Sequence, residues 1–214
     1  MNGLYKVQKK DLTRCAEVLA RAFFDYPMYR YVLGTQHSVA SMQVAARFFV
    51  NYAHRYGQVV APTAQIEGVL CTIASPNHRL TAWRLLRCGG LALSQLGAEV
   101  RGLYEQYDAF VSTIHRNTIT EPHQYIICIG IEPGRQGQGL ASRMLRPALA
   151  AAEAQGQYTY LETHNLENVG IYARYGFALA GEYPLPNSDI TVYTMLRSPG
   201  AAATLNAQLQ MASR

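Results

Sequence analysis

The stretch that decides the fold of this chain reads Ile129-Gly130-Ile131-Glu132-Pro133-Gly134-Arg135-Gln136-Gly137-Gln138-Gly139-Leu140-Ala141-Ser142. It ends an apolar run over residues 125–131, which has the length of a buried strand, and opens a helical pattern predicted over residues 137–155. Glycines let a ligand approach the backbone, and the unpaired amides of a first helical turn bind anions at the positive end of the helix dipole. The stretch therefore predicts a pyrophosphate site, with a ligand-free tight turn as the alternative.

Three designs of phosphate-binding turn compete for this stretch. A nucleoside-triphosphate loop needs Lys and then Ser or Thr after Gly139, where Leu140 and Ala141 stand, so this class is excluded. A dinucleotide fingerprint needs a third glycine in place of Ser142, and only about seventy residues follow, too few for a doubly wound sheet. Because Glu162 stands near the position of its ribose-binding acid, this second design stays a minor alternative.

The third design is the coenzyme turn of the GNAT superfamily of N-acetyltransferases, which this chain resembles. The family signature is Gln or Arg, two residues, Gly, one residue, then Gly or Ala, and here it reads Gln136-x-x-Gly139-x-Ala141. Upstream, an apolar strand, one residue and Pro133 match the family pattern. Downstream, residues 161–177 resemble its closing segment, which ends in Tyr172, three residues and Gly-Phe.

Within that superfamily the chain is most similar to puromycin N-acetyltransferase-like members. Residues 19–27 resemble their first helix and the loop after it, and residues 197–201 resemble their C-terminal end. The resemblance spans most of the chain and is weakest over residues 79–120. Acceptor specificity is expected to vary in this weakest stretch.

The resemblance implies an α/β (α+β) acyl-CoA N-acyltransferase fold. Its sheet is central, mixed and mostly antiparallel, with flanking helices and a helical insertion before the cofactor-binding strand. The hydrophobic patterns predict strands over residues 4–7, 58–61, 66–74, 125–131, 158–163, 177–183 and 191–196, the last two as an antiparallel pair. They predict helices over residues 12–23, 39–56, 137–155 and 165–175, and two more between 78 and 118 that separate near Gly97. One domain over residues 1–200 and a tail over 201–214 are expected.

Composition narrows the function classes. The formal charge is +5, but the basic residues form no dense cluster and no nucleic-acid motif, so no nucleic-acid partner is expected. No run reaches the ~20 apolar residues of a membrane helix, and the first residues do not read as a secretion signal. We expect a soluble cytoplasmic protein without a membrane partner. Cys15, Cys71, Cys88 and Cys128 are spaced like reduced core thiols, and no metal site is expected.

The resemblance also implies acetyl-CoA as a cosubstrate, transferred directly to an amine inside a ternary complex. The backbone of Ile129, Gly130 and Ile131 would pair with the pantetheine arm, and Asn165, with Asn168, would bind near the thioester. Arg135 and Arg143 are candidates for the outer phosphates. The pyrophosphate would be held by the turn, whose residues are Gln136, Gly137, Gln138, Gly139, Leu140, Ala141 and Ser142.

Tyr172 matches the family tyrosine near the coenzyme sulfur, so we interpret it as the general acid that protonates the departing thiolate. A phenol with an ordinary pKa of ~10 stays protonated for that task. A purely packing role for this tyrosine is the alternative. Glu162, at the end of a predicted strand, is the preferred general base, with His164 as a second candidate. Strand parity leaves this assignment open.

The acceptor is predicted to be the primary amine of a small molecule. Asp25, Tyr26 and Tyr29 stand around Pro27, which predicts a loop there, and loops often carry binding groups. Asp25 would attract a cationic amine, although such aromatic residues are equally often core. Protein or peptide amines are a second acceptor class, and a non-catalytic acyl-CoA-binding module is a rival function. The oligomeric state is open, a homodimer included.

Overall fold

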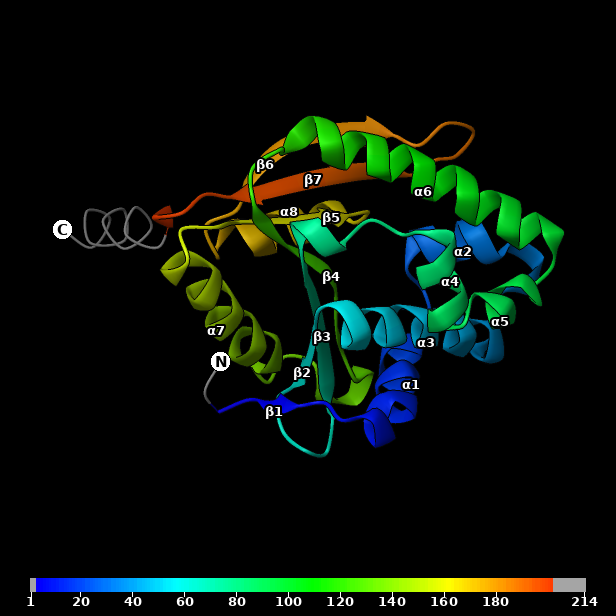
Figure 1. Cartoon of the computed structure of the whole chain (residues 1–214), viewed down its shortest axis with the longest axis horizontal. Helices are drawn as coiled ribbons and strands as arrows, with labels where there is room; N and C mark the ends of the chain where they lie inside the picture. Colours follow the sequence, from blue (N-terminus) through cyan, green and yellow to red (C-terminus); the bar gives the residue numbers. More distant parts are fainter. Residues whose placement is uncertain (1–2, 202–214) are drawn as a thin grey trace.

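Seven strands form one sheet in the computed structural model, which describes residues 3–201 (Figure 1). The strands are β1 (Tyr5–Lys6), β2 (Gln58–Ala61), β3 (Gly68–Ala74), β4 (His123–Ile131), β5 (Tyr158–Thr163), β6 (Ala178–Pro184) and β7 (Thr191–Arg197). Their order is β1-β2-β3-β4-β5-β7-β6. Within the described residues β4 and β5 form the one parallel pair, and the other neighbours are antiparallel. The predicted mixed, mostly antiparallel sheet is confirmed.

Helices cover both faces of the sheet (Figure 1). They are α1 (Leu12–Ala22), α2 (Pro27–Leu33), α3 (Val39–Tyr56), α4 (Ala82–Cys88), α5 (Gly90–Ser94), α6 (Ala98–Thr118), α7 (Leu140–Ala154) and α8 (Leu166–Ala173). On one face, Met144 and Leu145 of α7 pack against Leu161 of β5. On the other face, α1, α2 and α3 bury a larger apolar cluster with β2 and β3. These two cores hold the sheet between the helical layers.

The predicted helical insertion before β4 is present, but it holds three helices instead of two. The predicted break at Gly97 is confirmed, and a second break at Gly89 separates α4 from α5. Both glycines have left-handed backbone angles, with φ of 104° at Gly97 and 106° at Gly89. Such angles end a helix readily only at glycine, so each of these residues stops the helix before it.

Helix α1 lies directly on β4 because Gly130 has no side chain. A Cβ atom at this position would stand 2.8 Å from Leu19 Cδ2 and 3.0 Å from Ala22 Cβ. The close approach places the end of α1, and Phe23 after it, beside the last residues of β4. One wall of the site described below is positioned in this way.

Strands β4 and β5 run together only at their beginnings. Their pairing covers His123 to Tyr125 on β4 and Tyr158 to Tyr160 on β5. The β3–β4 register also shifts, because Cys71 pairs with Cys128 while Thr72 pairs with Ile126. Beyond Tyr125 the two strands therefore diverge, and the edge of β4 that faces β5 is not paired with it. The divergence opens the middle of the sheet.

The predicted loop at Pro27 is wrong, because α2 begins there. Pro27 occupies the first turn of α2 after an extended Tyr26. Proline suits this position, since its fixed φ is helical and its missing N–H would have no partner in the helix. Tyr29 consequently lies on a helix, with its side chain turned into the core.

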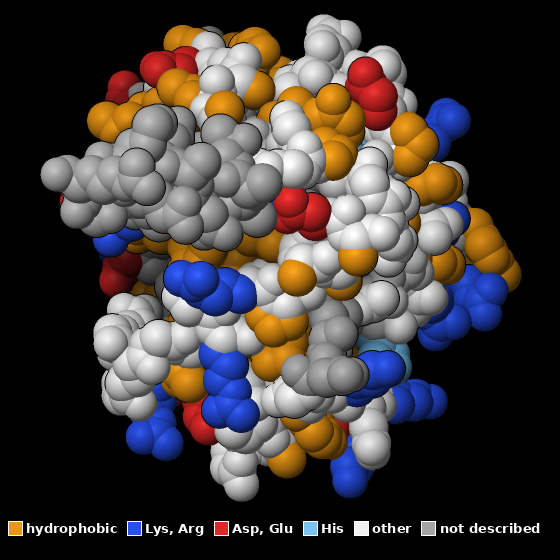
Figure 2. Space-filling view, turned by 90° about the vertical axis from the view of Figure 1, so that its left-hand side faces the viewer, with side chains coloured by type: hydrophobic (Ala, Val, Ile, Leu, Met, Phe, Trp, Pro, Cys, Tyr) orange, Lys and Arg blue, Asp and Glu red, His pale blue; other side chains and the backbone are white. Residues whose placement is uncertain are grey.

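Within residues 3–201 no helix is long and apolar enough to cross a membrane. On the face shown in Figure 2, lysine and arginine side chains lie in several separate groups among neutral and apolar ones. The predicted tail over residues 201–214 lies outside the described residues, except for Ala201. The expected single domain over residues 1–200 stays a prediction.

Candidate active site

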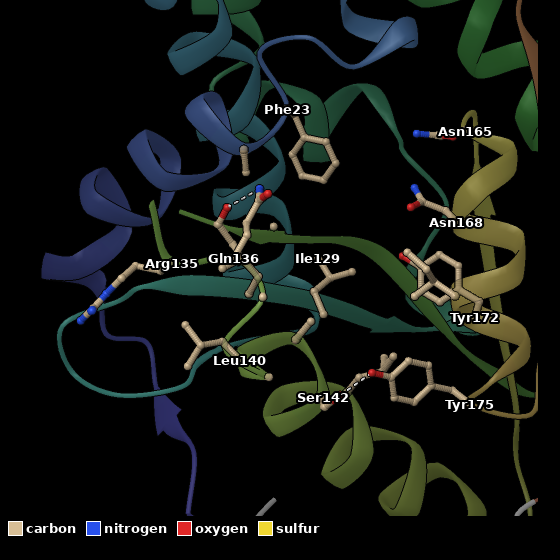
Figure 3. A pocket seen from close by; sticks show the side chains of 18 of the residues that line it. Phe23, Ile129, Arg135, Gln136, Leu140, Ser142, Asn165, Asn168, Tyr172 and Tyr175 are labelled. Carbon is tan, nitrogen blue, oxygen red and sulfur yellow. Dashed lines mark hydrogen bonds between the residues drawn. The ribbon is translucent and has the colours of Figure 1, made fainter. Parts of the chain in front are cut away.

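A cavity of about 450 Å³ opens where β4 and β5 diverge (Figure 3). Its walls come from the end of α1, the last residues of β4, the glycine turn, the start of α7 and one side of α8. The lining residues are Ala22, Phe23, Tyr26, Ile129, Gly130, Ile131, Arg135, Gln136, Gly137, Gly139, Leu140, Ala141, Ser142, Leu145, Asn165, Asn168, Ile171, Tyr172 and Tyr175. A volume of this size is typical of a small-molecule site.

The glycine turn is an open cradle at the start of α7. Gly137 and Gly139 have left-handed φ angles of 74° and 73°, and no atom lies within 4 Å of where their Cβ atoms would be. Helix α7 starts at Leu140, three residues later than predicted, and no side chain caps its N-terminus. Amides of its first turn are thus available to an anion. These features fit the diphosphate of a coenzyme.

Two connections hold the turn against the strand and the first helix. The Gln136 amide donates to the Ile131 carbonyl at 3.4 Å. Glu132 accepts from Arg21 through both carboxylate oxygens, at 2.5 and 2.8 Å, and from Arg14 at 3.1 Å. The hydrogen bond from Arg21, followed by its charge, holds the pKa of Glu132 below its ordinary value. Together these bonds fasten α1 to the end of β4.

Tyr172 lies on α8 with its hydroxyl directed into the cavity, toward Ile129 (Figure 3). Its ring packs edge-on against Phe177, with 5.8 Å between ring centroids. Burial raises the pKa of this phenol above its ordinary value. Tyr172 is therefore protonated at neutral pH, as a proton donor must be.

Side chains around Thr163 connect β5, α2 and α8 at one end of the cavity. Tyr26 Oη lies 3.1 Å from Thr163 Oγ1 and accepts the backbone N–H of His164 at 2.8 Å. The Asn168 amide donates to Thr163 Oγ1 at 3.0 Å. Oδ1 of the Asn165 side chain accepts the backbone N–H of Glu167 at 3.0 Å and so caps α8. This network orients both asparagines, and both line the cavity.

The predicted base Glu162 does not line the cavity. Its Oε2 accepts from Tyr125 at 2.6 Å, and its Oε1 is buried without a hydrogen-bond partner among the described residues. The phenol of Tyr160 also approaches this carboxylate without reaching hydrogen-bond geometry. Burial raises the pKa of Glu162 to about 7. Its carboxylate lies on the α6 side of β5, because Tyr160, on the same face of the strand, stacks on His115 of α6.

Of the three predicted acceptor residues, the structure brings only Tyr26 to the cavity. Asp25 is exposed and its carboxylate pairs with Arg30 on the surface. Tyr29 is 7% exposed and belongs to the core. The helix that starts at Pro27 explains the position of Tyr29, whose side chain it turns into the core, whereas Asp25 precedes the helix and is held on the surface by its pairing with Arg30. Gln138, predicted in the turn, also does not line the cavity.

Sequence reasoning missed several lining residues. Phe23 and Ala22 belong to α1 and its end, and they reach the cavity only because Gly130 lets α1 lie on β4. Tyr175, which was not predicted to belong to the site, also lines the cavity, and its Oη lies 2.5 Å from Ser142 Oγ. No sequence signal identified these contacts, since each joins elements that lie far apart along the chain.

Within residues 3–201 no cluster of three His, Cys, Asp or Glu side chains is arranged to hold a metal ion.

Comparisons with known proteins agree on one family. The model of the Acetyltransferase (GNAT) family matches residues 97–177. An uncharacterised N-acetyltransferase of Schizosaccharomyces pombe is 24% identical over 203 residues, which cover 91% of this chain and 82% of the relative.

Solved structures share the whole fold. A Corynebacterium glutamicum structure, described as histone acetyltransferase HPA2 and related acetyltransferase, has a TM-score of 0.64 at 18% identity. The match covers 92% of this chain and 95% of the Corynebacterium glutamicum chain. An Aedes aegypti structure, described as arylalkylamine N-acetyltransferase 7, has a TM-score of 0.61 at 11% identity, and the match covers 90% of this chain and 85% of that one. At these identities the likeness is one of fold.

Proposed function

Because this chain belongs to the GNAT superfamily of acetyl-CoA-dependent N-acetyltransferases, we propose that it acetylates the primary amine of a small molecule by direct transfer in a ternary complex. One observation carries the proposal. A single cavity holds the left-handed glycines of the turn at one end and the Tyr172 hydroxyl at the other, along an edge of β4 that β5 leaves unpaired.

The cosubstrate would lie along this edge. The backbone of Ile129 to Ile131 offers the peptide groups for the pantetheine arm, and the turn from Gln136 to Ser142 offers amides for the diphosphate. Arg135 lines the cavity and can reach an outer phosphate, while Arg143 is exposed on α7. Asn165 and Asn168 lie where the thioester end would arrive.

Transfer requires three events at the thioester carbon. The neutral amine attacks and forms the N–C bond, the C–S bond breaks, and the thiolate takes the proton of Tyr172. The attacking nitrogen must also lose a proton to a base. We propose Glu162 as this base. Burial raises its pKa to about 7, so a large fraction of its carboxyl group is ionised at neutral pH.

Two features support a small acceptor. Phe23 and Tyr26 line the cavity, their rings meet edge-on with centroids 5.2 Å apart, and such an aromatic wall suits a compact apolar amine. Two Aedes aegypti structures of this fold are described as arylalkylamine N-acetyltransferases 7 and 2. A protein acceptor is the second candidate, because an Escherichia coli structure of this fold is the ribosomal-protein-S18-alanine N-acetyltransferase.

An acceptor panel tests the proposal. Purified protein and acetyl-CoA are combined with 2-phenylethylamine, a polyamine, puromycin and a peptide with a free N-terminus, and free thiol release is followed. Release with a small amine is the expected result. Release with the peptide alone would overturn the acceptor class. Tight calorimetric binding of acetyl-CoA without thiol release from any amine would favour the acyl-CoA-binding module instead.

A further inference from the structure

A chain of polar side chains leads from the cavity wall to helix α6. It begins at Tyr26, which lines the cavity and whose Oη lies 3.3 Å from Nδ1 of His164. The other ring nitrogen of His164, Nε2, lies 2.8 Å from Oη of Tyr107 on α6. The rings are in contact as well, with the centroid of His164 5.5 Å from that of Tyr26 and 5.6 Å from that of Tyr107. The imidazole thus joins two phenols.

The hydroxyl partners of His164 leave both of its tautomers available. A carboxylate or carbonyl beside one ring nitrogen would hold a proton there, whereas a hydroxyl donates or accepts equally well. Burial lowers the pKa of His164 to about 4, so the ring is neutral at physiological pH. A neutral imidazole between two hydroxyls passes a proton by receiving it on one nitrogen and releasing it from the other.

Glu162 is the carboxylate beside the end of this chain, and within the described residues no hydrogen bond joins it to Tyr107. Burial, and then the charge of this neighbouring carboxylate, raise the pKa of Tyr107. The Oε1 atom of Glu162 is buried and has no hydrogen-bond partner within residues 3–201, so this carboxylate oxygen can accept a proton. Tyr125 from β4 donates to the other oxygen, and Asp108 on α6 adds a negative charge nearby. These groups face the chain of side chains from β4, β5 and α6.

We propose that Tyr26, His164 and Tyr107 form a relay that carries the proton of the acceptor amine to Glu162. The inference rests on the proposed function, and it explains how a base outside the cavity can serve the reaction. Tyr26 is the member that touches the substrate, and His164 and Tyr107 act through it. The helical insertion thereby takes part in catalysis through Tyr107.

The protons balance along the relay. The N–H bond of the amine breaks and its proton goes to Tyr26 Oη, as the proton of Tyr26 moves to Nδ1 of His164. The proton on Nε2 moves to Tyr107 Oη, and that of Tyr107 moves to the Glu162 carboxylate. Each relay member keeps one proton, His164 ends in its other tautomer, and Glu162 ends neutral. Hydroxyl rotation and exchange with solvent restore the starting state.

The first test removes single members of the relay. His164→Gln keeps a polar side chain but does not exchange tautomers, and Tyr107→Phe keeps the ring but lacks the hydroxyl. Each should lower kcat about 100-fold, the scale of general base catalysis, without changing the KM for acetyl-CoA, and the variant should stay folded at the assay temperature despite losing a buried hydrogen bond. The double variant should be no slower than His164→Gln alone, since both changes interrupt one path. Tyr104→Phe is the matched control on α6, because the Tyr104 hydroxyl is buried without a hydrogen-bond partner in the described part of the chain.

The second test separates proton transfer from structural support. Rates are measured with 2-phenylethylamine, or the strongly basic amine that the panel selects, and with its β,β-difluoro analogue, a much weaker base. The His164→Gln loss should be at least ten times smaller with the weak base, whose nitrogen gives up its proton more easily. Equal losses with both amines, or none, would overturn the relay. A wild-type protein that acetylates no amine would instead overturn the proposed function.

Discussion

At the scale of single residues, two side chains divide the proposed proton transfers between them. Tyr172 is neutral and directed into the cavity, so it can give a proton to the thiolate. Glu162 is enclosed beyond the cavity and has a pKa of about 7, so it can take a proton from the amine. At neutral pH the surroundings keep Tyr172 protonated and leave Glu162 partly ionised. Two titratable groups in different protonation states are typical of a general acid and a general base.

Replacing Tyr172 with Phe should separate chemistry from cosubstrate binding. The variant loses the proton donor but keeps the ring that packs on Phe177, so kcat should fall by about 100-fold or more. The dissociation constant of acetyl-CoA should stay within about twofold, because the proposed diphosphate site is at the other end of the cavity. Steady-state kinetics and calorimetry measure the two effects. A fully active variant would remove Tyr172 from the mechanism.

The pH dependence of kcat should report Glu162. Its pKa is raised from the ordinary 4.5 to about 7, so the basic, ionised form accumulates only as the pH rises through this value. We expect kcat to increase up to about pH 7 and then level off. Glu162→Gln should be about 100-fold slower and should lose this rise. A rise of the same shape in the variant would assign it to another group.

At the scale of elements, the turn between β4 and α7 matters through its backbone. Gly137 and Gly139 hold left-handed angles that a side chain disfavours, and they leave open the space that a diphosphate needs. The sequence signal for this element was strong because a few residue types supply both properties. In the insertion the sequence signal was weak. Nothing in the sequence distinguishes Gly89 from a glycine inside a helix, and only its left-handed φ shows that a helix ends there.

Substituting Ala for Gly139 should weaken cosubstrate binding. Its Cβ would project into the cradle, and the left-handed angle would be strained by about 1 kcal/mol. We expect the dissociation constant of acetyl-CoA to rise at least tenfold in calorimetry. Gly134→Ala is the matched control, because Gly134 belongs to the same turn, has no left-handed angle and lies outside the cavity lining. Equal effects of the two substitutions would contradict a backbone cradle.

At the scale of the whole molecule, the insertion is joined to the sheet by buried imidazoles. His115 of α6 and His123 of β4 are each 3% exposed, and their Nε2 atoms lie 2.8 Å apart. His115 also stacks on Tyr160, with ring centroids 4.1 Å apart. Together these contacts fasten α6 over β4 and β5, next to Glu162.

This pair should make folding stability sensitive to acid. Burial lowers the pKa of His115 from 6.5 to about 3 and also lowers that of His123. The unfolded chain therefore binds protons first, and stability is complete above pH 6.5 and is lost as the pH falls toward 3. Each imidazole contributes a slope of at most about 1.4 kcal/mol per pH unit. Chemical denaturation between pH 4 and 8 measures it, and His115→Gln should flatten the curve. An unchanged slope would exclude His115 as its source.

The sequence by itself determined the order of the strands along the chain, the position of the glycine turn and the resemblance to the GNAT superfamily. These signals are local, because hydrophobic periods, glycines at a helix start and the spacing to Tyr172 are all read along the chain. Only the tertiary structure showed that Asp25, Tyr29 and Glu162 lie outside the cavity lining and that Phe23 belongs to it. Such facts depend on how distant segments meet. Packing sets them, through Gly130 under α1 and Tyr107 of the insertion beside β5.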